Sequence, residues 1–278
     1  KNAHLVAIGD VNVINQANNL LGNPIELIEI KSISSETLEP LAFGQLAVYP
    51  SGTPVEGKIK YGHIEAQYGQ AAYESIICSI DLALNGVIDG VVTNPINKEA
   101  LRASGVPQAG HTEIFAERTH TKRYAMMLLH EPLRIVHVST HVALREACDL
   151  VKKERVLEVI QLTHQTVRRL DGMLKPIAVA GLNPHAGENG LFGVEEIEEI
   201  IPAVEKAQSL GIPVVGPLPP DTIFSRAMSG EFSAVIAMYH DQGHIPLKLA
   251  GFRVDSQSGS FTEISGVNIT LGLPIIRT

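Results

Sequence analysis

The sequence predicts an α/β fold in which parallel strands are covered by crossover helices on both faces of the sheet. Short, continuous runs rich in Val and Ile alternate along the chain with longer segments of helical periodicity. That alternation is typical of buried parallel strands joined by helices. The 278 residues, 45 % hydrophobic and 19 % charged, suit one large or two medium globular domains.

The first half of the chain contributes strands and helices in alternation. Strands are predicted at residues 4–8 and 24–30, and the helix between them, residues 13–21, ends at Gly22, a residue typical of helix C-termini. A long amphipathic helix is predicted over 61–85, then a buried strand over 86–94. A further helix opens at Asn97, after Pro95.

The second half repeats the pattern without a linker. Three apolar strands are predicted at residues 133–140, 176–182 and 232–239, with helices at 150–170 and 194–210. Glutamates fill the first turns of the second helix, where the helix dipole favours negative charge. We place the domain boundary near Pro107, which gives two α/β/α domains: residues 1–106 with 272–278, and residues 107–271.

Charge and composition favour a small-molecule partner. Lys and Arg number 22 against 30 Asp and Glu, a net charge of −8, and there is no Trp. Such a chain has neither the basic surface nor the stacking platforms that nucleic acids or anionic lipids require. Cys78 and Cys148 form no CxxC pair, and no long apolar span or signal peptide is present. A cytoplasmic location is expected.

Three histidines occupy equivalent positions at or just past the carboxyl ends of predicted strands. His141, His185 and His240 would converge there, because ligands of open α/β sheets bind outside these ends. Three imidazoles suit a catalytic Zn²⁺, although Co²⁺, Ni²⁺ or Mg²⁺ could occupy the site. The alternative is that each histidine only caps a strand. His244 ranks behind the three, because Gly243 and Pro246 interrupt helical spacing.

The remaining histidines show no such placement and are interpreted as surface or satisfied core residues: His4, His63, His120, His130, His137 and His164. The glycine-rich segment 183–193 would let backbone amides approach a ligand, or would simply form a turn. No GxGxxG follows the first strand, so a Rossmann dinucleotide site is not indicated.

Several charged or polar residues are candidates for binding an anion. The GHTE segment at 110–113 places His111 at a predicted helix N-terminus with Thr112 as its cap, and phosphate is favoured there. Lys248 and Arg277 are candidate cations for the same purpose, or solvated surface charges. Asp241 could orient the neighbouring His240 or act as an acid or base. Asp221 starts a further helix.

Six segments resemble one family over nearly the whole chain and in the expected order: GHTE (110–113), STHVALRE (139–146), LNPHAGENGLFG (182–193), GPLPPDT (216–222), MYHDQGHIPLK (238–248) and VNITLGLPIIRT (267–278). The sequence is similar to the PdxA family, the 4-hydroxythreonine-4-phosphate dehydrogenases of pyridoxal phosphate biosynthesis. The resemblance implies a fold like isocitrate and isopropylmalate dehydrogenases and a homodimer with active sites at the subunit interface. It implies metal ligands His141, His185 and His240, and substrate-binding residues His111, Thr112, Lys248, Asn268 and Arg277.

The reaction implied by the resemblance is metal-dependent hydride transfer from the secondary alcohol of a 4-phosphorylated 3-hydroxy acid to NAD or NADP, followed by decarboxylation of the β-keto acid. The first expected substrate is 4-phosphohydroxy-L-threonine. Lys98 and Asp241 are the candidate general bases. Several runs also resemble a branch that oxidises 4-phospho-D-threonate or 4-phospho-D-erythronate. A zinc hydrolase and a non-catalytic phosphate- or metal-binding protein are the alternatives from other classes.

Three departures from the family pattern bear on these expectations. The printed sequence lacks the family's GDPAGIGPE-like opening segment and its DHGTA-like continuation after Thr278, so part of the cofactor site is expected to be missing from it. Residues 253–265 form a longer polar link than the family has. We interpret this insert as a loop rather than a flap near Lys248.

Overall fold

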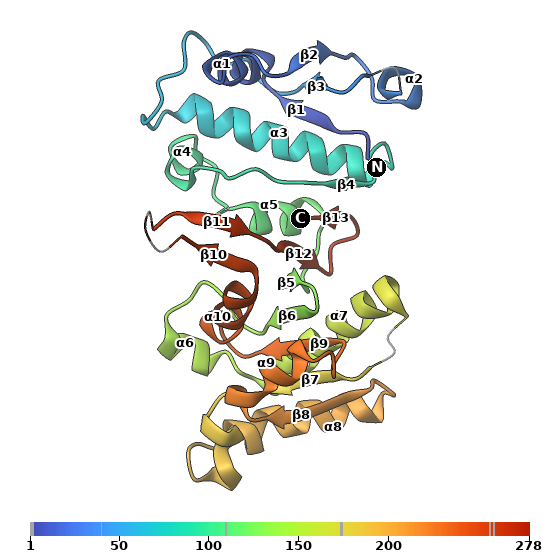
Figure 1. The fold of residues 1–278 in the computed structure, drawn as a ribbon, viewed down its shortest axis with the longest axis vertical. Coiled ribbons are helices and arrows are strands. Elements are labelled where there is room, and N and C mark those ends of the chain that lie inside the picture. The colour runs from blue at the N-terminus through green and yellow to red at the C-terminus, as the bar shows by residue number, and fades with distance from the viewer. Residues whose placement is uncertain (1–2, 40, 109, 173–174, 256, 258) are drawn as a thin grey trace. The chain divides into compact units, whose positions relative to one another are not determined.

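The structure, a computed structural model, describes residues 3–39, 41–108, 110–172, 175–255, 257 and 259–278 (Figure 1). Its internal contacts divide the chain into two units, Lys1–Lys122 with Leu273–Arg277, and Arg123–Gly272 with Thr278. The boundary predicted from the sequence, after residue 106, lies earlier in the chain than this division. The domain assignment from sequence stays a prediction.

The first unit begins with an alternation of short strands and helices, as predicted. Asp10 caps the first helix, since its carboxylate accepts a hydrogen bond from the Val13 amide at 2.9 Å and another from the Val55 amide at 2.6 Å. The elements of the unit are β1 (Val6–Gly9), α1 (Val11–Leu20), β2 (Glu26–Glu29), α2 (Ser35–Leu38), β3 (Gln45–Pro50), α3 (Ala66–Leu84), β4 (Gly90–Val91), α4 (Lys98–Ala103), α5 (His111–Arg118) and β13 (Ile276–Arg277).

Two small parallel sheets organise the first unit. One has the strand order β1-β3-β2, and the other pairs β13 with β4, with Arg277 opposite Val91. Ile80, Leu101 and Phe115 from α3, α4 and α5 are buried together in its core. The strand predicted over 86–94 is therefore wrong in extent: only Gly90 and Val91 pair, and residues 86–89 form turns and bends.

The second unit is a three-layer α/β/α arrangement around one six-stranded sheet. Its elements are β5 (Ala125–His130), β6 (Leu133–His137), α6 (Leu144–Asp149), α7 (Lys153–Asp171), β7 (Ile177–Ala180), η1 (Pro184–Gly190), η2 (Glu196–Ile200), α8 (Ile201–Ser209), β8 (Val214–Leu218), α9 (Pro220–Met228), β9 (Ala234–Ala237), α10 (His240–Gly251), β10 (Phe252–Val254), β11 (Phe261–Ile264) and β12 (Val267–Leu271). Side chains of α7 and α8 pack on one face of the sheet, and those of α9 and α10 on the other.

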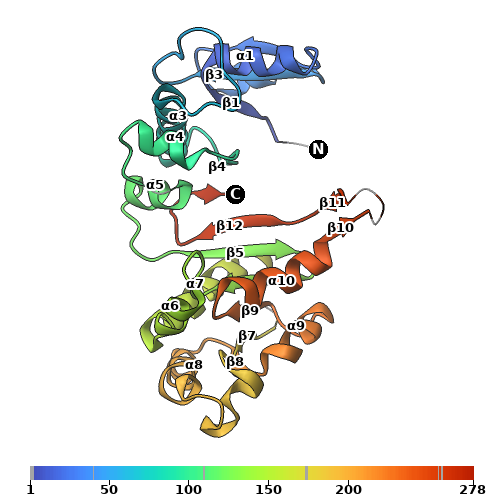
Figure 2. The same ribbon diagram turned by 90° about the vertical axis from the view of Figure 1, so that its left-hand side faces the viewer.

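The strand order of this sheet is β12-β5-β6-β9-β7-β8, and it is mixed rather than wholly parallel. The four strands from β6 to β8 run parallel, whereas β5 is antiparallel to both of its neighbours. The reason is local: β5 and β6 are joined by a turn at Glu131 and Pro132, and so short a connection permits only a hairpin. Figure 2 shows β12 lying along β5.

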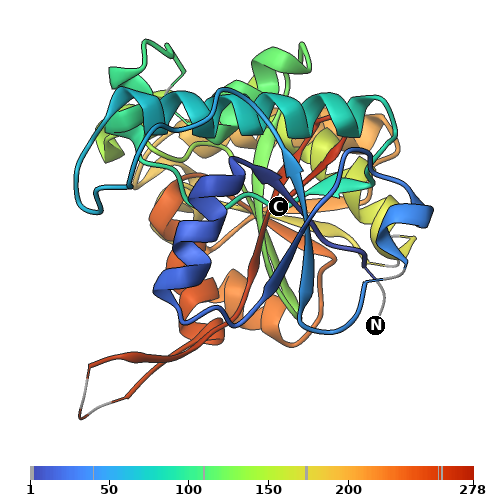
Figure 3. The ribbon, with the colours of Figure 1, turned by 90° about the horizontal axis from the view of Figure 1, so that it is seen from above.

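The segment 253–265, predicted to be a loop, forms most of a β-hairpin. Arg253 pairs with Glu263, and Phe252 with Ile264, in antiparallel register. The hairpin, drawn in red, extends beyond α10 in Figure 3. Ser256 and Ser258, which belong to the predicted loop, lie outside the described residues. Backbone pairing here overrides the polar composition on which the loop prediction depended.

Candidate active site

Three neighbouring parallel strands bring the predicted histidine positions to one edge of the second unit's sheet. The strands β6, β9 and β7 are adjacent in the sheet, and His141, His240 and His185 follow their carboxyl ends. Buried Gln242 links the carboxyl ends of β9 and β7. Its Oε1 accepts from the Met238 amide at 2.6 Å, and its Nε2 donates to the Gly181 carbonyl at 2.8 Å. The topological part of the sequence argument is therefore correct.

His240 is the first residue of α10 and is held by its neighbour. Its Nδ1 lies 2.7 Å from Oδ1 of Asp241. Because an ionised carboxylate can only accept, Nδ1 carries the proton and Nε2 of a neutral ring keeps its lone pair. The His141 ring lies 5.6 Å from the His240 ring, centroid to centroid. Two of the three predicted metal ligands are therefore neighbours, and one is in the tautomer that a metal ion requires.

His244 lies closer to His240 than the sequence indicated. The two rings stack with centroids 3.6 Å apart and planes 11° apart, and α10 is continuous through Pro246. The expectation that Gly243 and Pro246 break helical spacing is wrong. Gly243 is in the helix because of packing: a Cβ at this position would lie 2.4 Å from Nε2 of His137. Tertiary contact here overrides intrinsic helix propensity.

His137 is a core residue that lies beneath these histidines. It is 1 % exposed at the end of β6, and its ring centroid is 4.8 Å from that of His244. Burial, and after it the nearby His244, lower the pKa of His137 to about 3. The imidazole is therefore neutral at physiological pH and packs as a polar aromatic ring under α10.

His185 lies on a segment with unusual backbone geometry. Every residue from His185 to Asn189 has a positive φ, between 42° and 77°. Left-handed backbone costs a residue with a side chain roughly 1–2 kcal/mol, and such strain concentrates at functional sites. The His185 ring packs on Phe192, with centroids 6.2 Å apart.

The three predicted ligands are not gathered into a cluster. Among the residues that the structure describes, no group of three or more His, Cys, Asp or Glu side chains is arranged to hold a metal ion. The three-histidine site stays a prediction, supported by strand order and by the His141–His240 pair. Its donor set, three imidazoles of which one has a fixed tautomer, suits Zn²⁺ or a similar divalent ion.

The predicted anion-binding residues of the first unit lie together at the start of α5. Arg277 is 8 % exposed, its Nη2 donates to Oγ1 of Thr93 at 3.1 Å, and its guanidinium lies 5.7 Å from the Phe115 ring centroid. Burial and the charge of Arg277 lower the pKa of His111 to about 4. A Cβ at Gly110 would lie 3.7 Å from Cε of Lys98, so this amine is also at the start of the helix.

Two details of this region differ from the sequence interpretation. The residue that caps α5 is Gly110, which makes no side-chain cap, and Thr112 lies inside the first turn. The helix starts two residues earlier than a Thr112 cap requires, because His111 and Thr112 already have helical geometry. Thr93, which follows β4 and binds Arg277, was not singled out, since a lone threonine after a strand carries no sequence signal.

The other two predicted substrate-binding residues belong to the second unit. Lys248 is exposed on α10, with its amine 5.9 Å from the Phe252 ring centroid. Asn268 is exposed on β12, opposite Leu128 in the antiparallel register. Both side chains are therefore accessible to a ligand.

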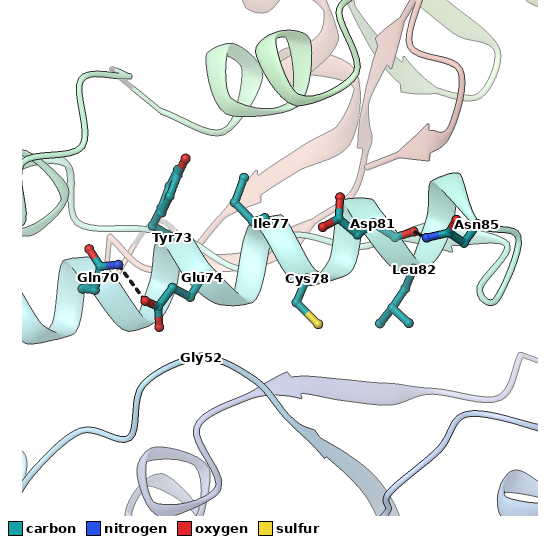
Figure 4. A pocket seen from close by; sticks show the side chains of 9 residues that line it. All are labelled: Gly52, Gln70, Tyr73, Glu74, Ile77, Cys78, Asp81, Leu82 and Asn85. Atoms are coloured by element: carbon teal, nitrogen blue, oxygen red, sulfur yellow. Dashed lines mark hydrogen bonds between the residues drawn. The ribbon is translucent and has the colours of Figure 1, made fainter.

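One cavity of the second unit includes predicted site residues. It has a volume of about 320 Å³ and is lined by Thr140, His141, Val142, Leu144, Ala147, Tyr239, His240 and Asp241. A larger cavity, about 510 Å³, runs along α3 in the first unit (Figure 4) and is lined by Gly52, Gln70, Tyr73, Glu74, Ile77, Cys78, Asp81, Leu82 and Asn85. None of the predicted site residues lines the larger cavity, and its two carboxylates already bind other groups: Glu74 the Thr53 amide, Asp81 the Arg118 guanidinium.

Comparison with known proteins assigns the chain to a family. The family model of the pyridoxal phosphate biosynthetic protein PdxA matches residues 1–278. The D-threonate 4-phosphate dehydrogenase of Salmonella typhimurium is 43 % identical over 279 residues, which cover 99 % of this chain and 80 % of that protein. The 4-hydroxythreonine-4-phosphate dehydrogenase of Beijerinckia indica is 42 % identical over 279 residues, with 98 % and 77 % covered.

A solved structure agrees with these sequence relatives. The 4-hydroxythreonine-4-phosphate dehydrogenase from Klebsiella pneumoniae superposes with a TM-score of 0.84 at 38 % identity, covering 98 % of this chain and 78 % of that one. Fold and relatives together define an α/β dehydrogenase, an oxidoreductase that acts on a CH–OH group. The chain belongs to the PdxA family. The predicted fold class, family and enzyme class are confirmed.

Within the part of the chain that the structure describes, no helix combines the length and apolar character needed to cross a membrane.

Proposed function

We propose that this dehydrogenase oxidises the secondary alcohol of a 4-phosphorylated hydroxy acid and passes the hydride to NAD or NADP. D-Threonate 4-phosphate is the proposed substrate, because relatives 42–43 % identical to this chain from Pectobacterium atrosepticum and Salmonella typhimurium carry that name. 4-Phosphohydroxy-L-threonine is the second candidate, favoured by the relative from Beijerinckia indica. With either substrate the β-keto product would lose CO₂, and with the second the reaction would serve pyridoxal phosphate synthesis.

The observation that carries the proposal is the group of cations at the start of α5. Arg277 is held by Thr93 and Phe115, and a buried guanidinium of fixed orientation suits the bidentate recognition of a phosphate. His111 and Thr112 in the first turn add hydrogen-bond donors there, and the helix dipole adds positive potential. This local positive charge is what an anionic substrate needs in a protein of net charge −8.

We propose that His141, His185 and His240 hold a divalent cation, with Zn²⁺ first and Co²⁺, Ni²⁺ or Mg²⁺ as alternatives. A bound cation would act as a Lewis acid toward the substrate hydroxyl and would stabilise the enolate formed on decarboxylation. The chain's own contribution is to orient the ligands. Asp241 accepts from Nδ1 of His240 at 2.7 Å and so presents the unprotonated Nε2.

We assign the general base to Lys98 and the orienting role to Asp241. Lys98 is exposed at the N-terminus of α4, beside Gly110, where its amine could reach a substrate bound by His111 and Arg277. The Asp241 carboxylate already accepts a hydrogen bond from Nδ1 of His240, which leaves it less suited to take a proton from the substrate. Lys248 and Asn268 complete the proposed substrate contacts from the second unit.

We also propose a cytoplasmic homodimer. Large apolar side chains are exposed on α10, β11 and β12, where Ile245 is 57 %, Leu249 79 % and Phe261 58 % exposed. A second copy of the chain would remove such surface from water.

The test of the proposed function is NADH or NADPH formation, followed by absorbance. Protein stripped of metal is supplied with Zn²⁺, Mg²⁺, Co²⁺ or Ni²⁺ and offered D-threonate 4-phosphate, 4-phosphohydroxy-L-threonine or D-erythronate 4-phosphate. Metal-dependent reduction of the cofactor is expected, and the preferred substrate identifies the branch. The proposal would be overturned if folded, metal-loaded protein reduced neither cofactor with any of the three substrates. Phosphate binding without turnover would indicate a non-catalytic protein.

A further inference from the structure

A buried carboxylate lies behind the segment that carries His185. Glu196 is 1 % exposed at the start of η2. Its Oε1 accepts from the amides of Leu182 and Asn183 at 2.7 and 2.8 Å, and its Oε2 accepts from Nδ2 of Asn183 at 2.9 Å. These bonds fix two of the four residues, 181–184, that connect β7 to the left-handed segment 185–189.

The same segment is shaped around this carboxylate. A Cβ at Gly187 would lie 2.7 Å from Oε2 of Glu196, and a Cβ at Gly181 would lie 2.7 Å from Cα of Ala186 and 3.1 Å from Oε1 of Glu196. Any side chain at either position would push the segment away from the carboxylate. The backbone before and after His185 is therefore packed directly on Glu196.

The hydrogen-bond pattern calls for an ionised carboxylate rather than an amide. Asn183 donates from Nδ2 to Glu196 and also to Oε2 of Glu195 at 2.7 Å. A glutamine at position 196 that kept both backbone bonds would turn its own NH₂ toward that of Asn183. Rotating the Asn183 amide would then place its oxygen against the Glu195 carboxylate.

The charge has no cationic side chain as its partner. In the described part of the chain no Lys, Arg or His forms an ion pair with Glu196. Its hydrogen-bond donors there are the N–H groups of Leu182 and Asn183. A buried carboxylate satisfied only by dipoles keeps much of its negative potential, and weak screening in the interior extends that potential to the adjacent segment. A cation bound at His185 would be stabilised by it.

We propose that Glu196 is a positioning residue for the His185 segment: it fixes residues 182–187, and with them the left-handed backbone that begins at His185 and presents its imidazole, and its charge favours a divalent cation there. This inference rests on the proposed metal-dependent function. It adds a residue that does not touch the metal, the substrate or the cofactor.

The test compares Glu196→Gln with Glu198→Gln, a matched change of an exposed glutamate two residues further along the chain. Two measurements are made on the full chain: amide hydrogen exchange of the peptide spanning 182–192, and Co²⁺ affinity from the visible absorption of the bound ion. Glu196→Gln is expected to speed amide exchange of that peptide. It is also expected to weaken Co²⁺ binding by about tenfold or more, as the loss of a residue that orients a metal ligand commonly does. Glu198→Gln is expected to change neither.

Kinetics separate positioning from a merely structural role. In Glu196→Gln, kcat is expected to fall at limiting metal and to recover at saturating metal, because the chemistry itself is untouched. If Glu196→Gln does not fold, Asn183→Ser replaces it, since this change removes the side-chain bonds to Oε2 of Glu196 and Oε2 of Glu195 and keeps both backbone bonds to Glu196. A several-fold effect in the same direction is expected.

Three results would overturn the inference: unchanged exchange, Co²⁺ affinity within twofold of wild type, or a loss of kcat that saturating metal does not restore. Wild-type protein that binds no Co²⁺ would instead overturn the proposed metal site, while the exchange comparison still decides whether Glu196 fixes the segment.

Discussion

His240 and His244 stack one turn apart on α10, and His244 donates from Nδ1 to the carbonyl oxygen of His240 at 2.9 Å. A carbonyl can only accept, so this contact fixes the tautomer of His244 as Asp241 fixes that of His240. Burial is the main reason why the pKa of His244 is lowered. The first turn of α10 therefore presents two imidazoles of defined protonation at the edge of the sheet.

Gly243→Ala should destabilise the protein, although alanine is the better helix former. The added Cβ would lie 2.4 Å from Nε2 of His137, and overpacking of this kind costs about 1–3 kcal/mol. Urea unfolding measures the loss. In the His137→Ala background the same change should cost less, since the nearest obstruction is gone and only Cγ2 of Ile135, 2.7 Å from the added Cβ, remains. Equal losses in the two backgrounds would contradict this close packing.

His185→Ala should remove stoichiometric metal retention and turnover together, because the proposed site then has only two imidazoles. Metal content after gel filtration and the rate of NADH formation are measured in the same preparation. His63→Asn, a change of an exposed histidine in the other unit, is the control. Full activity in the His185→Ala protein would exclude the three-histidine site.

Arg277→Ala should raise KM for the phosphorylated substrate roughly tenfold or more and leave KM for the cofactor nearly unchanged. Hydrogen bonds to charged groups contribute about 1.5–3 kcal/mol, the range that such a change in KM requires. Because Arg277 is buried against Phe115, Arg277→Lys is a second variant that keeps the charge but loses the bidentate geometry. Equal changes in both KM values would contradict a phosphate-binding role.

Asp241→Asn should weaken metal binding by about 10–100-fold, as the loss of a hydrogen-bonded carboxylate behind a metal-ligating histidine commonly does. Lys98→Met should leave metal binding unchanged and lower kcat. The two variants are compared by metal titration and by the pH dependence of kcat. If Asp241→Asn keeps full metal affinity but loses the acidic limb of the kcat profile, where a general base becomes protonated, the two roles are reversed.

The stability of the protein should fall in mild acid because of His111. Its pKa is lowered from 6.5 to about 4, so the unfolded chain binds a proton that the folded chain refuses over this interval. The stability that depends on neutral His111 is therefore fully present above pH 6.5 and is lost as the pH falls toward about 4. Urea midpoints at about pH 7 and about pH 5 should differ less in His111→Gln than in wild type. An identical difference between the two urea midpoints in both proteins would contradict this role of His111.

The alternation of apolar strands and helices along the chain predicted the fold better than the composition of single segments did. The Val- and Ile-rich runs at 133–140, 176–182 and 232–239 contain β6, β7 and β9, because a strand buried on both faces has a strong sequence signal. The antiparallel direction of β5 and the pairing of residues 252–264 both come from hairpins that lie within short stretches of the chain. Neither segment is a Val- and Ile-rich run of the kind on which the strand predictions depended.

The candidate site shows the same limit. Positions after strands predicted that His141 and His240 would be neighbours, since parallel strands share an edge. Glu196 was noted only as one of several acidic residues in the first turns of a helix. Its burial could not be predicted, because it depends on how residues 181–187 wrap around the carboxylate.

Ala125, at the start of β5, pairs with Leu271, at the end of β12. The chain therefore enters and leaves the second unit at neighbouring positions of two adjacent strands. The second unit is thus one uninterrupted stretch inserted between Lys122 and Leu273. During synthesis Arg277 emerges only after this whole insertion has been made. The proposed phosphate site therefore lacks its guanidinium until the second unit has been translated, and a nascent chain that has only its first 122 residues lacks it too.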